Sequence, residues 1–181
     1  MTSLPPIEHR KRVKTAKSAA KLALLPRSAT PGPVFVSHVA EDYEKALKIV
    51  VQLERRGIRC WIAPRDVHAG RSFDDQIAAA IEACWAMLLI FSSRNNQSDY
   101  IRREVTVADD TGKIIIPFRI ENVQPQKGLR MRLGGLHWVD AFDGRQDAIG
   151  AVVQALESLT RNHVRTLRVS QGRAATGKRP R

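Results

Sequence analysis

The sequence predicts an α/β fold in which a doubly wound, five-stranded parallel sheet is covered by helices on both faces. Short apolar runs alternate with amphipathic segments over residues 33–163, as strands do when crossover helices connect them in a parallel sheet. One run, AMLLIFSS at residues 86–93, is almost continuously apolar, which is typical of a strand buried on both faces. We expect the flavodoxin-like strand order 2-1-3-4-5, in which the winding reverses between the first and third strands.

The first half of this body contains two predicted strands and two predicted helices. In chain order they are a strand at 33–37, a helix at 41–57, a strand at 58–63, a loop at 64–72 and a helix at 73–84. In the first helix, apolar residues recur at helical spacing from Ala46 to Leu53, and Gly57 ends it. Ser72 is the predicted N-cap of the second helix, with Asp75 three positions later.

The second half continues the same alternation. The predicted elements are a strand at 86–93, a helix at 98–112, a strand at 113–120, an irregular segment at 121–134, a strand at 135–141 and a helix at 144–162. Ser98 is suited to cap the helix that it begins, and Gly112 ends that helix. His137 and Trp138 lie in an apolar run, and we expect them in the core.

The net charge of +12 is confined to the two ends of the chain. Seven lysines and arginines face one acidic residue at 1–32, six face none at 164–181, and the body between them is therefore neutral. We expect a basic N-terminal extension at 1–32, partly helical, an α/β domain at 33–163 and a basic, disordered tail at 164–181. A neutral body argues against a fold whose main surface binds nucleic acid.

The basic ends leave three interpretations open. They are solvated and disordered, they bind nucleic acid or anionic membrane weakly, or they control assembly. No apolar stretch approaches the roughly 20 residues that span a bilayer, and the basic N-terminus does not have the pattern of a secretory signal. Cys60 and Cys84 lie in apolar surroundings, without metal-ligand spacing, and are expected to be buried free thiols. We therefore expect a cytoplasmic protein.

Glu104 lies in the stretch SDYIRREVTVAD, on the helix that follows the third predicted strand. A glutamate on a helix is ordinarily a solvated charge. In a doubly wound sheet, however, ligands bind at the carboxyl ends of the strands where the winding reverses, here after Ser37 and Ser92. Because Tyr100 is four positions from Glu104, the two side chains share one helix face and can contact one ligand.

Five stretches resemble, in the same order, motifs of bacterial TIR (Toll/interleukin-1 receptor) domains. They are VFVSHVAED, GIRCWIAPRDVHAGRSF, FSSRNNQSDYIRREV, KIIIPFRIENV and GGLHWVDA. The second stretch contains the long loop that is called the BB loop in this family, here residues 63–73, and the third contains the helix that carries the family's active-site glutamate. The resemblance covers residues 33–162 and implies the same fold.

The resemblance implies an enzyme that cleaves NAD+ at the nicotinamide–ribosyl bond and releases linear or cyclic ADP-ribose. Glu104 matches the family's catalytic glutamate, and Tyr100 stands where enzymatic members commonly carry a tryptophan. Phe73 of the BB loop would border the nicotinamide side of the pocket. Ser37 and His38 follow the first strand and either line the cleft or cap the next helix.

One carboxylate is chemically sufficient for this reaction. Glycosidases use a second carboxyl group to protonate the leaving oxygen, whereas a pyridinium departs as a neutral group without a proton. The carboxylate then stabilises the positive charge that develops on the ribose. NAD+ is thus a substrate, and we expect no cofactor and no metal site. Its pyrophosphate is expected to contact Arg65 and Arg71 in the BB loop, or the N-terminus of a helix.

The resemblance further implies activation by self-association, with the BB loop of one copy shaping the pocket of its neighbour. Bacterial antiphage defence or a host-directed effector activity would be the setting. The alternative is a non-enzymatic TIR adaptor that signals only through contacts between TIR domains. A third interpretation is a binder of nucleic acid or membrane that uses its basic tails for binding and the TIR-like body for dimerisation.

Overall fold

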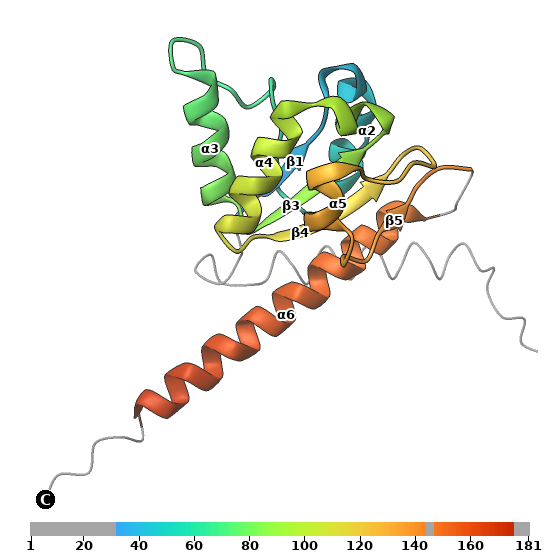
Figure 1. Cartoon of the computed structure of the whole chain (residues 1–181). Coiled ribbons are helices and arrows are strands. Elements are labelled where there is room, and N and C mark those ends of the chain that lie inside the picture. Colours follow the sequence, from blue (N-terminus) through green and yellow to red (C-terminus); the bar gives the residue numbers. More distant parts are fainter. Residues whose placement is uncertain (1–31, 144–146, 176–181) are drawn as a thin grey trace, which may run out of the picture.

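The computed structural model describes residues 32–143 and 147–175 and contains one five-stranded sheet of order β2-β1-β3-β4-β5 (Figure 1). Its strands are β1 (Val34–Ser37), β2 (Cys60–Trp61), β3 (Ala86–Phe91), β4 (Ile114–Arg119) and β5 (Val139–Asp140). All four neighbouring pairs are parallel. The predicted flavodoxin-like order and the parallel sheet are therefore confirmed.

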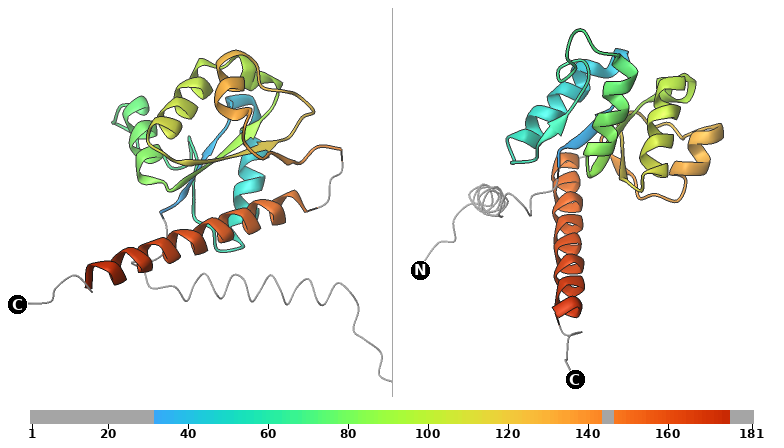
Figure 2. Two further views of the ribbon diagram at one scale, coloured as in Figure 1. Left: turned by 60° about the horizontal axis from the view of Figure 1, so that its bottom comes forward. Right: turned by 90° about the vertical axis from the view of Figure 1, so that its left-hand side faces the viewer.

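Helices cover both faces of the sheet (Figures 1 and 2). They are α2 (Tyr43–Glu54), α3 (Phe73–Ala83), α4 (Asp99–Asp110), α5 (Lys127–Leu133) and α6 (Ala148–Ala175), with short 3-10 helices η1 (Ala40–Asp42) and η2 (Ser93–Gln97). Apolar residues of α2 and α6 pack on one face, and those of α3, α4 and α5 pack on the other. This two-sided cover is the layer arrangement that the alternating pattern predicted.

The central strand β3 shows why its sequence is apolar throughout. Alternate side chains of a strand point to opposite faces, so both sets must meet a helical layer. One set packs in the cluster with α2 and α6, and the other packs in the cluster with α3 and α4. The set that faces α2 and α6 is Ala86, Leu88 and Ile90. The set that faces α3 and α4 is Met87, Leu89 and Phe91.

The predicted N-caps of α3 and α4 and the glycines predicted to end α2 and α4 are confirmed. Ser98 Oγ accepts a hydrogen bond from the N–H of Ile101 at 3.2 Å, and Ser72 caps α3 in the same way. Gly57 and Gly112 adopt φ values of 83° and 66°, which residues with a side chain rarely adopt. These two glycines therefore end α2 and α4 in the left-handed conformation that commonly follows a helix.

Three expectations about the C-terminal part were wrong. Residues 121–134 are not wholly irregular, because α5 forms there and buries Leu129 and Leu133. The final helix does not end at residue 162 but runs to Ala175, because no proline interrupts it (Figure 1). Strand β5 has only two residues, and His137 before it is exposed, not in the core.

Parts of the basic ends lie outside the described residues. This holds for residues 1–31 of the predicted N-terminal extension, including its predicted helix, and for residues 176–181 of the predicted tail. Residues 164–175, which we assigned to a disordered tail, continue α6. None of the described helices combines the length and the apolar character needed to cross a membrane.

We expect Leu88→Ala to destabilise the fold strongly, because Leu88 is fully buried at the centre of the sheet. The loss should be about 2–5 kcal/mol of unfolding free energy, from lost apolar contact and the cavity left behind. Chemical denaturation measures it. Met131→Ala is the matched control, because Met131 is 88% exposed and its removal should change stability by less than about 0.5 kcal/mol. Equal effects of the two substitutions would contradict this assignment of the core.

Candidate active site

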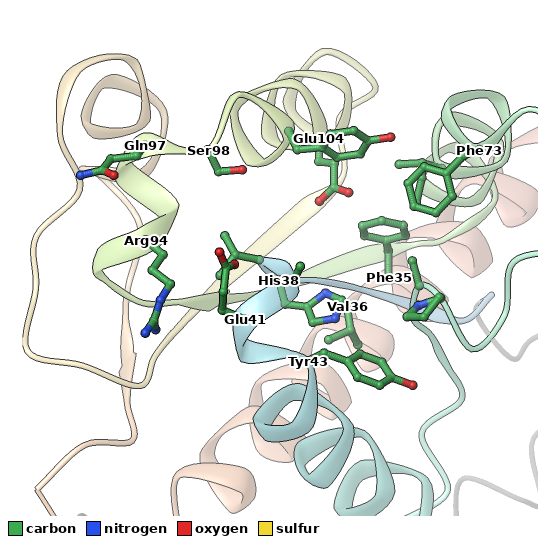
Figure 3. Close-up of a pocket in the computed structure, with 16 residues that line it drawn as sticks. Phe35, Val36, His38, Glu41, Tyr43, Phe73, Arg94, Gln97, Ser98 and Glu104 are labelled. Carbon is green, nitrogen blue, oxygen red and sulfur yellow. The ribbon is translucent and has the colours of Figure 1, made fainter.

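A cavity of about 950 Å³ opens at the carboxyl edge of the sheet, beside the ends of β1 and β3 (Figure 3). Its walls come from β1 and the following loop, the residues after β2, the first turns of α3, η2 and the start of α4. This is the edge at which the winding of the sheet reverses, where ligands of doubly wound folds bind. The predicted position of the site agrees with this cavity.

Glu104 lines the cavity and is buried, with 7% of its surface exposed. Its Oε2 accepts a hydrogen bond of 2.6 Å from the hydroxyl of Ser37, the last residue of β1. The bond joins residues 67 positions apart, because the sheet places the end of β1 against the middle of α4. In Figure 3 the carboxylate of Glu104 points into the cavity. Glu104 is therefore not a solvated charge on the surface of α4.

Burial raises the pKa of Glu104 from 4.5 to about 7, against the smaller lowering effect of the Ser37 hydrogen bond. A carboxylate is costly to ionise away from water, and one donated hydrogen bond compensates only part of that cost. At neutral pH the side chain is thus divided between its protonated and ionised forms. A strongly perturbed carboxyl group in a cavity is a common property of active sites.

Two aromatic rings stand beside Glu104, as the sequence predicted. Phe73, at the start of α3, and Tyr100, on α4, have ring centroids 5.9 Å apart and planes tilted by 54°. The hydroxyl of Tyr100 donates a hydrogen bond to Asp74, and the guanidinium of Arg103 lies 5.2 Å from the Tyr100 ring. Burial and the Asp74 hydrogen bond raise the pKa of Tyr100 to about 12, so the hydroxyl remains a donor.

His38 also lines the cavity, and its ring packs at 5.5 Å from that of Tyr43. Among the described side chains, His38 Nε2 is the buried nitrogen or oxygen atom without a hydrogen-bond partner. Burial lowers the pKa of His38, against the raising effect of nearby Asp42. A neutral imidazole with a free nitrogen is suited to bind a ligand group, so a ligand role for His38 remains our prediction.

A second polar cluster, which the sequence reasoning missed, closes the other end of the cavity. Asp42 is fully buried and accepts hydrogen bonds from Ser92 Oγ at 2.5 Å and from Arg94 Nη1 at 3.4 Å. Asn95 accepts from the Ser92 N–H and donates to a β3 carbonyl. Arg94 lines the cavity. Its place directly after the third strand is the sequence signal that could have identified it.

The predicted phosphate contacts of the BB loop are not brought to the cavity. Arg65 pairs with Asp66 at 2.8 Å and with Glu54 at 3.0 Å, and it donates to the Cys60 carbonyl at 3.0 Å. Arg71 is exposed and is not among the residues that line the cavity. The guanidinium of Arg65 thus anchors the loop to α2 and β2, and a pyrophosphate contact of either arginine remains a prediction without support from this geometry.

The described residues contain no cluster of histidine, cysteine, aspartate or glutamate that would hold a metal ion. Cys60 and Cys84 are buried and unpaired, as predicted, and burial raises the pKa of each thiol to about 12. Such thiols are poor nucleophiles because the reactive form is the thiolate. The chemistry available in the cavity is therefore that of the carboxyl groups of Glu104 and Glu41, an imidazole, aromatic rings and a guanidinium.

The fold and the site together define a doubly wound α/β domain with a buried glutamate at its ligand-binding edge. The TIR-domain family model matches residues 34–156, and the chain belongs to this family. No curated protein matches the chain.

Solved structures confirm the fold. The TIR domain of the Toll-related receptor TRR-2 of Hydra magnipapillata has 20% identity and a TM-score of 0.58, over 72% of this chain and 98% of that one. TIR domains of the activated Roq1 resistosome have 16% identity and a TM-score of 0.56, over 70% of this chain and 98% of that one. A metazoan TIR-STING receptor from C. gigas has 23% identity and a TM-score of 0.58, over 72% and 41%.

The raised pKa of Glu104 predicts that this residue lowers stability at alkaline pH. Because the folded state holds its proton more tightly than the unfolded state, the stabilising contribution is present below about pH 4.5 and is lost as pH rises through about 7. Glu104→Gln should therefore raise the unfolding free energy at pH 8, by up to about 3 kcal/mol, and change it little at pH 4.5.

Denaturant titrations at the two pH values measure this difference. Glu44→Gln, at an exposed position of α2, is the matched control and should show no such pH-dependent gain. A gain for Glu104→Gln that is the same at both pH values would contradict the assignment of a proton to this carboxyl group.

Proposed function

We propose that the protein is an NAD+ glycohydrolase that cleaves the bond between nicotinamide and ribose. The observation that carries this proposal is the buried Glu104 carboxyl group, which faces the cavity with Ser37 behind it and the rings of Phe73 and Tyr100 beside it. Membership of the TIR family supports the same chemistry through the resemblance of the Glu104 helix to the family's active-site helix. NAD+ is the substrate, and no cofactor enters the reaction.

The reaction requires a group that stabilises positive charge. The bond between C1′ of the ribose and the pyridinium nitrogen breaks, and its electron pair leaves with nicotinamide, which becomes neutral. The ribosyl group carries the positive charge until water attacks C1′ and releases a proton to give ADP-ribose; attack by another atom of the same molecule gives a cyclic product. The ionised carboxylate of Glu104 stabilises this charge most strongly in the transition state, which is where stabilisation accelerates a reaction.

The geometry supports separate positions for the two parts of the substrate. Glu104 accepts hydrogen bonds from ribose hydroxyls, in place of or in addition to the one from Ser37. Phe73 and Tyr100 bind the nicotinamide ring by stacking, since planar rings pair favourably with aromatic side chains. Tyr100 takes the place of the tryptophan that is common in this family, and its hydroxyl, fixed by Asp74, orients the ring.

We further propose that self-association through the BB loop, residues 63–73, controls activity. Phe73 at the end of this loop is 44% exposed although it is apolar and lines the cavity, so a neighbouring copy can cover it. Antiphage defence or effector activity would use such a switch. An adaptor that binds other TIR domains without cleaving NAD+ is the competing function, and it would retain this loop surface without needing a buried carboxylate.

Concentrated protein should release nicotinamide from NAD+, and Glu104→Gln should lower the rate by at least about 100-fold, as removal of a group that stabilises transition-state charge does. Chromatography of nicotinamide and ADP-ribose over time measures both. Glu44→Gln on exposed α2 should keep the wild-type rate. Absence of release by the wild type under crowded or assembled conditions would favour the adaptor, whereas an active Glu104→Gln variant would place catalysis elsewhere.

The rate of nicotinamide release should rise with pH and level off above about 7. The reaction needs ionised Glu104, so kcat/KM should fall about tenfold per pH unit below the pKa of this group in the free enzyme. Ser37→Ala removes the hydrogen bond that lowers this pKa, and the rise should therefore move to higher pH. A rate that is independent of pH between 5 and 8, or a profile that Ser37→Ala moves to lower pH, would contradict the role of Glu104.

A further inference from the structure

The cavity has two chemically different ends, with Glu104 between them. Phe73 lies on one side of the Glu104 carboxylate, and Arg94, Gln97 and Ser98 lie on the opposite side (Figure 3). Along the walls that the structure describes, Arg94 is the only lysine or arginine. A ligand that places an aromatic ring beside Phe73 and a ribose at Glu104 therefore extends its next group toward Arg94.

Arg94 has two acidic partners, but they leave most of its N–H groups available to a ligand. Its Nη1 lies 3.4 Å from Asp42 Oδ1 and 3.8 Å from Glu121 Oε1, and these two ion pairs use the same nitrogen. The side chain is 49% exposed, so such long, solvated pairs contribute little to stability. Asp42 in turn is fixed by Ser92, whose hydroxyl donates to the other carboxylate oxygen. The remaining N–H groups of the guanidinium keep their fork geometry, which matches two oxygens of a phosphate.

Neutral hydrogen-bonding groups surround the same end. Ser98 caps α4 by accepting from the N–H of Ile101, and its hydroxyl hydrogen remains able to donate to a ligand. The amide of Gln97 lines the cavity next to it. An anionic oxygen at this end would receive one charged and two neutral donors. Two acids are nearby, Glu41 in the cavity wall and Asp42, which pairs with Arg94. Their negative charge repels anions in general, so this end favours a ligand whose anionic group contacts the guanidinium directly.

From this arrangement we infer that Arg94 binds the phosphate attached to the nicotinamide ribose, and that the site is specific for phosphorylated nicotinamide nucleosides. The substrate carries its aromatic base, ribose and phosphate in the same order as Phe73, Glu104 and Arg94 lie along the cavity (Figure 3). The inference rests on the proposed function, because it deepens the use of the same site. Arg94, which lines the cavity, thus replaces Arg65 and Arg71 of the BB loop as the proposed phosphate contact.

Binding of ADP-ribose and of nicotinamide riboside, which lacks phosphate, tests this inference in the Glu104→Gln background, where neither ligand is turned over. Isothermal titration calorimetry should show that Arg94→Gln weakens ADP-ribose binding about 10–100-fold, as expected when a charged hydrogen bond to phosphate is lost. Nicotinamide riboside binding should stay within about twofold, since that ligand has no phosphate to lose. Arg94→Lys should retain part of the ADP-ribose affinity because it keeps the charge.

Arg55→Gln, at an exposed position directly after α2, is the control for loss of one positive charge and should change neither affinity. Equal weakening of both ligands by Arg94→Gln would overturn the inference and assign Arg94 a structural role through Asp42. No weakening, no measurable ADP-ribose binding in the parent, or a loss caused instead by Arg71→Gln would overturn it as well. Failure of wild-type protein to release nicotinamide is a separate outcome, which rejects the proposed enzyme while ADP-ribose binding still reports on Arg94.

Discussion

The parallel pairing of β1 with β3 is the constraint on which the rest of the site depends. Its register sets Val34 beside Ala86 and Ser37 beside Leu89, so both strands end at the same edge of the sheet. Hydrogen bonds then join the two sides: the Ser37 hydroxyl donates to Glu104 on α4, and the Ser92 hydroxyl donates to Asp42 of η1, which follows β1. Because the winding reverses between these strands, no helix covers the edge, and a cavity remains open there.

The two buried carboxyl groups at this edge are treated differently by the fold. Asp42 accepts hydrogen bonds from a hydroxyl and from two cationic side chains, so its charge is compensated and it serves to connect loops. Glu104 receives only the hydroxyl of Ser37, and burial raises its pKa to about 7. A buried carboxyl group with several hydrogen-bond donors around it has a structural role. A carboxyl group that lines a cavity and has few donors can accept further hydrogen bonds from a ligand. This contrast distinguishes Asp42, which connects loops, from Glu104, which we propose as the reactive acid.

Local sequence patterns predicted the caps of α3 and α4, because each cap depends on neighbouring residues. The strand order followed instead from the fold class that the alternating strands and helices indicate. The helix period and the switch point placed Tyr100 and Glu104 beside one cavity, and the resemblance to TIR domains added Phe73. What they did not predict depends on distant partners. Helix α5 is stabilised by two of its own leucines, Leu129 and Leu133, which pack into the core despite a proline and glycines nearby. Arg65 looked free in the loop, but Glu54 and Asp66 bind it.

The aromatic pair connects the BB loop to α4, the helix that carries Glu104, and this connection is a route by which a contact at the loop can reach that residue. Phe73 contacts the ring of Tyr100, and Asp74 accepts the hydrogen bond of its hydroxyl, so both ends of the tyrosine are held by the first turn of α3. That turn follows directly on the loop and is joined to it, because the Gln76 side chain bonds the backbone of His68 in both directions. A contact that moves the loop must therefore move the support of Tyr100, one helical turn from Glu104. The loop and the cavity are thus linked through the first turn of α3, and we propose that a surface contact at the loop can change the shape of the Phe73 end of the cavity without touching the Glu104 carboxylate.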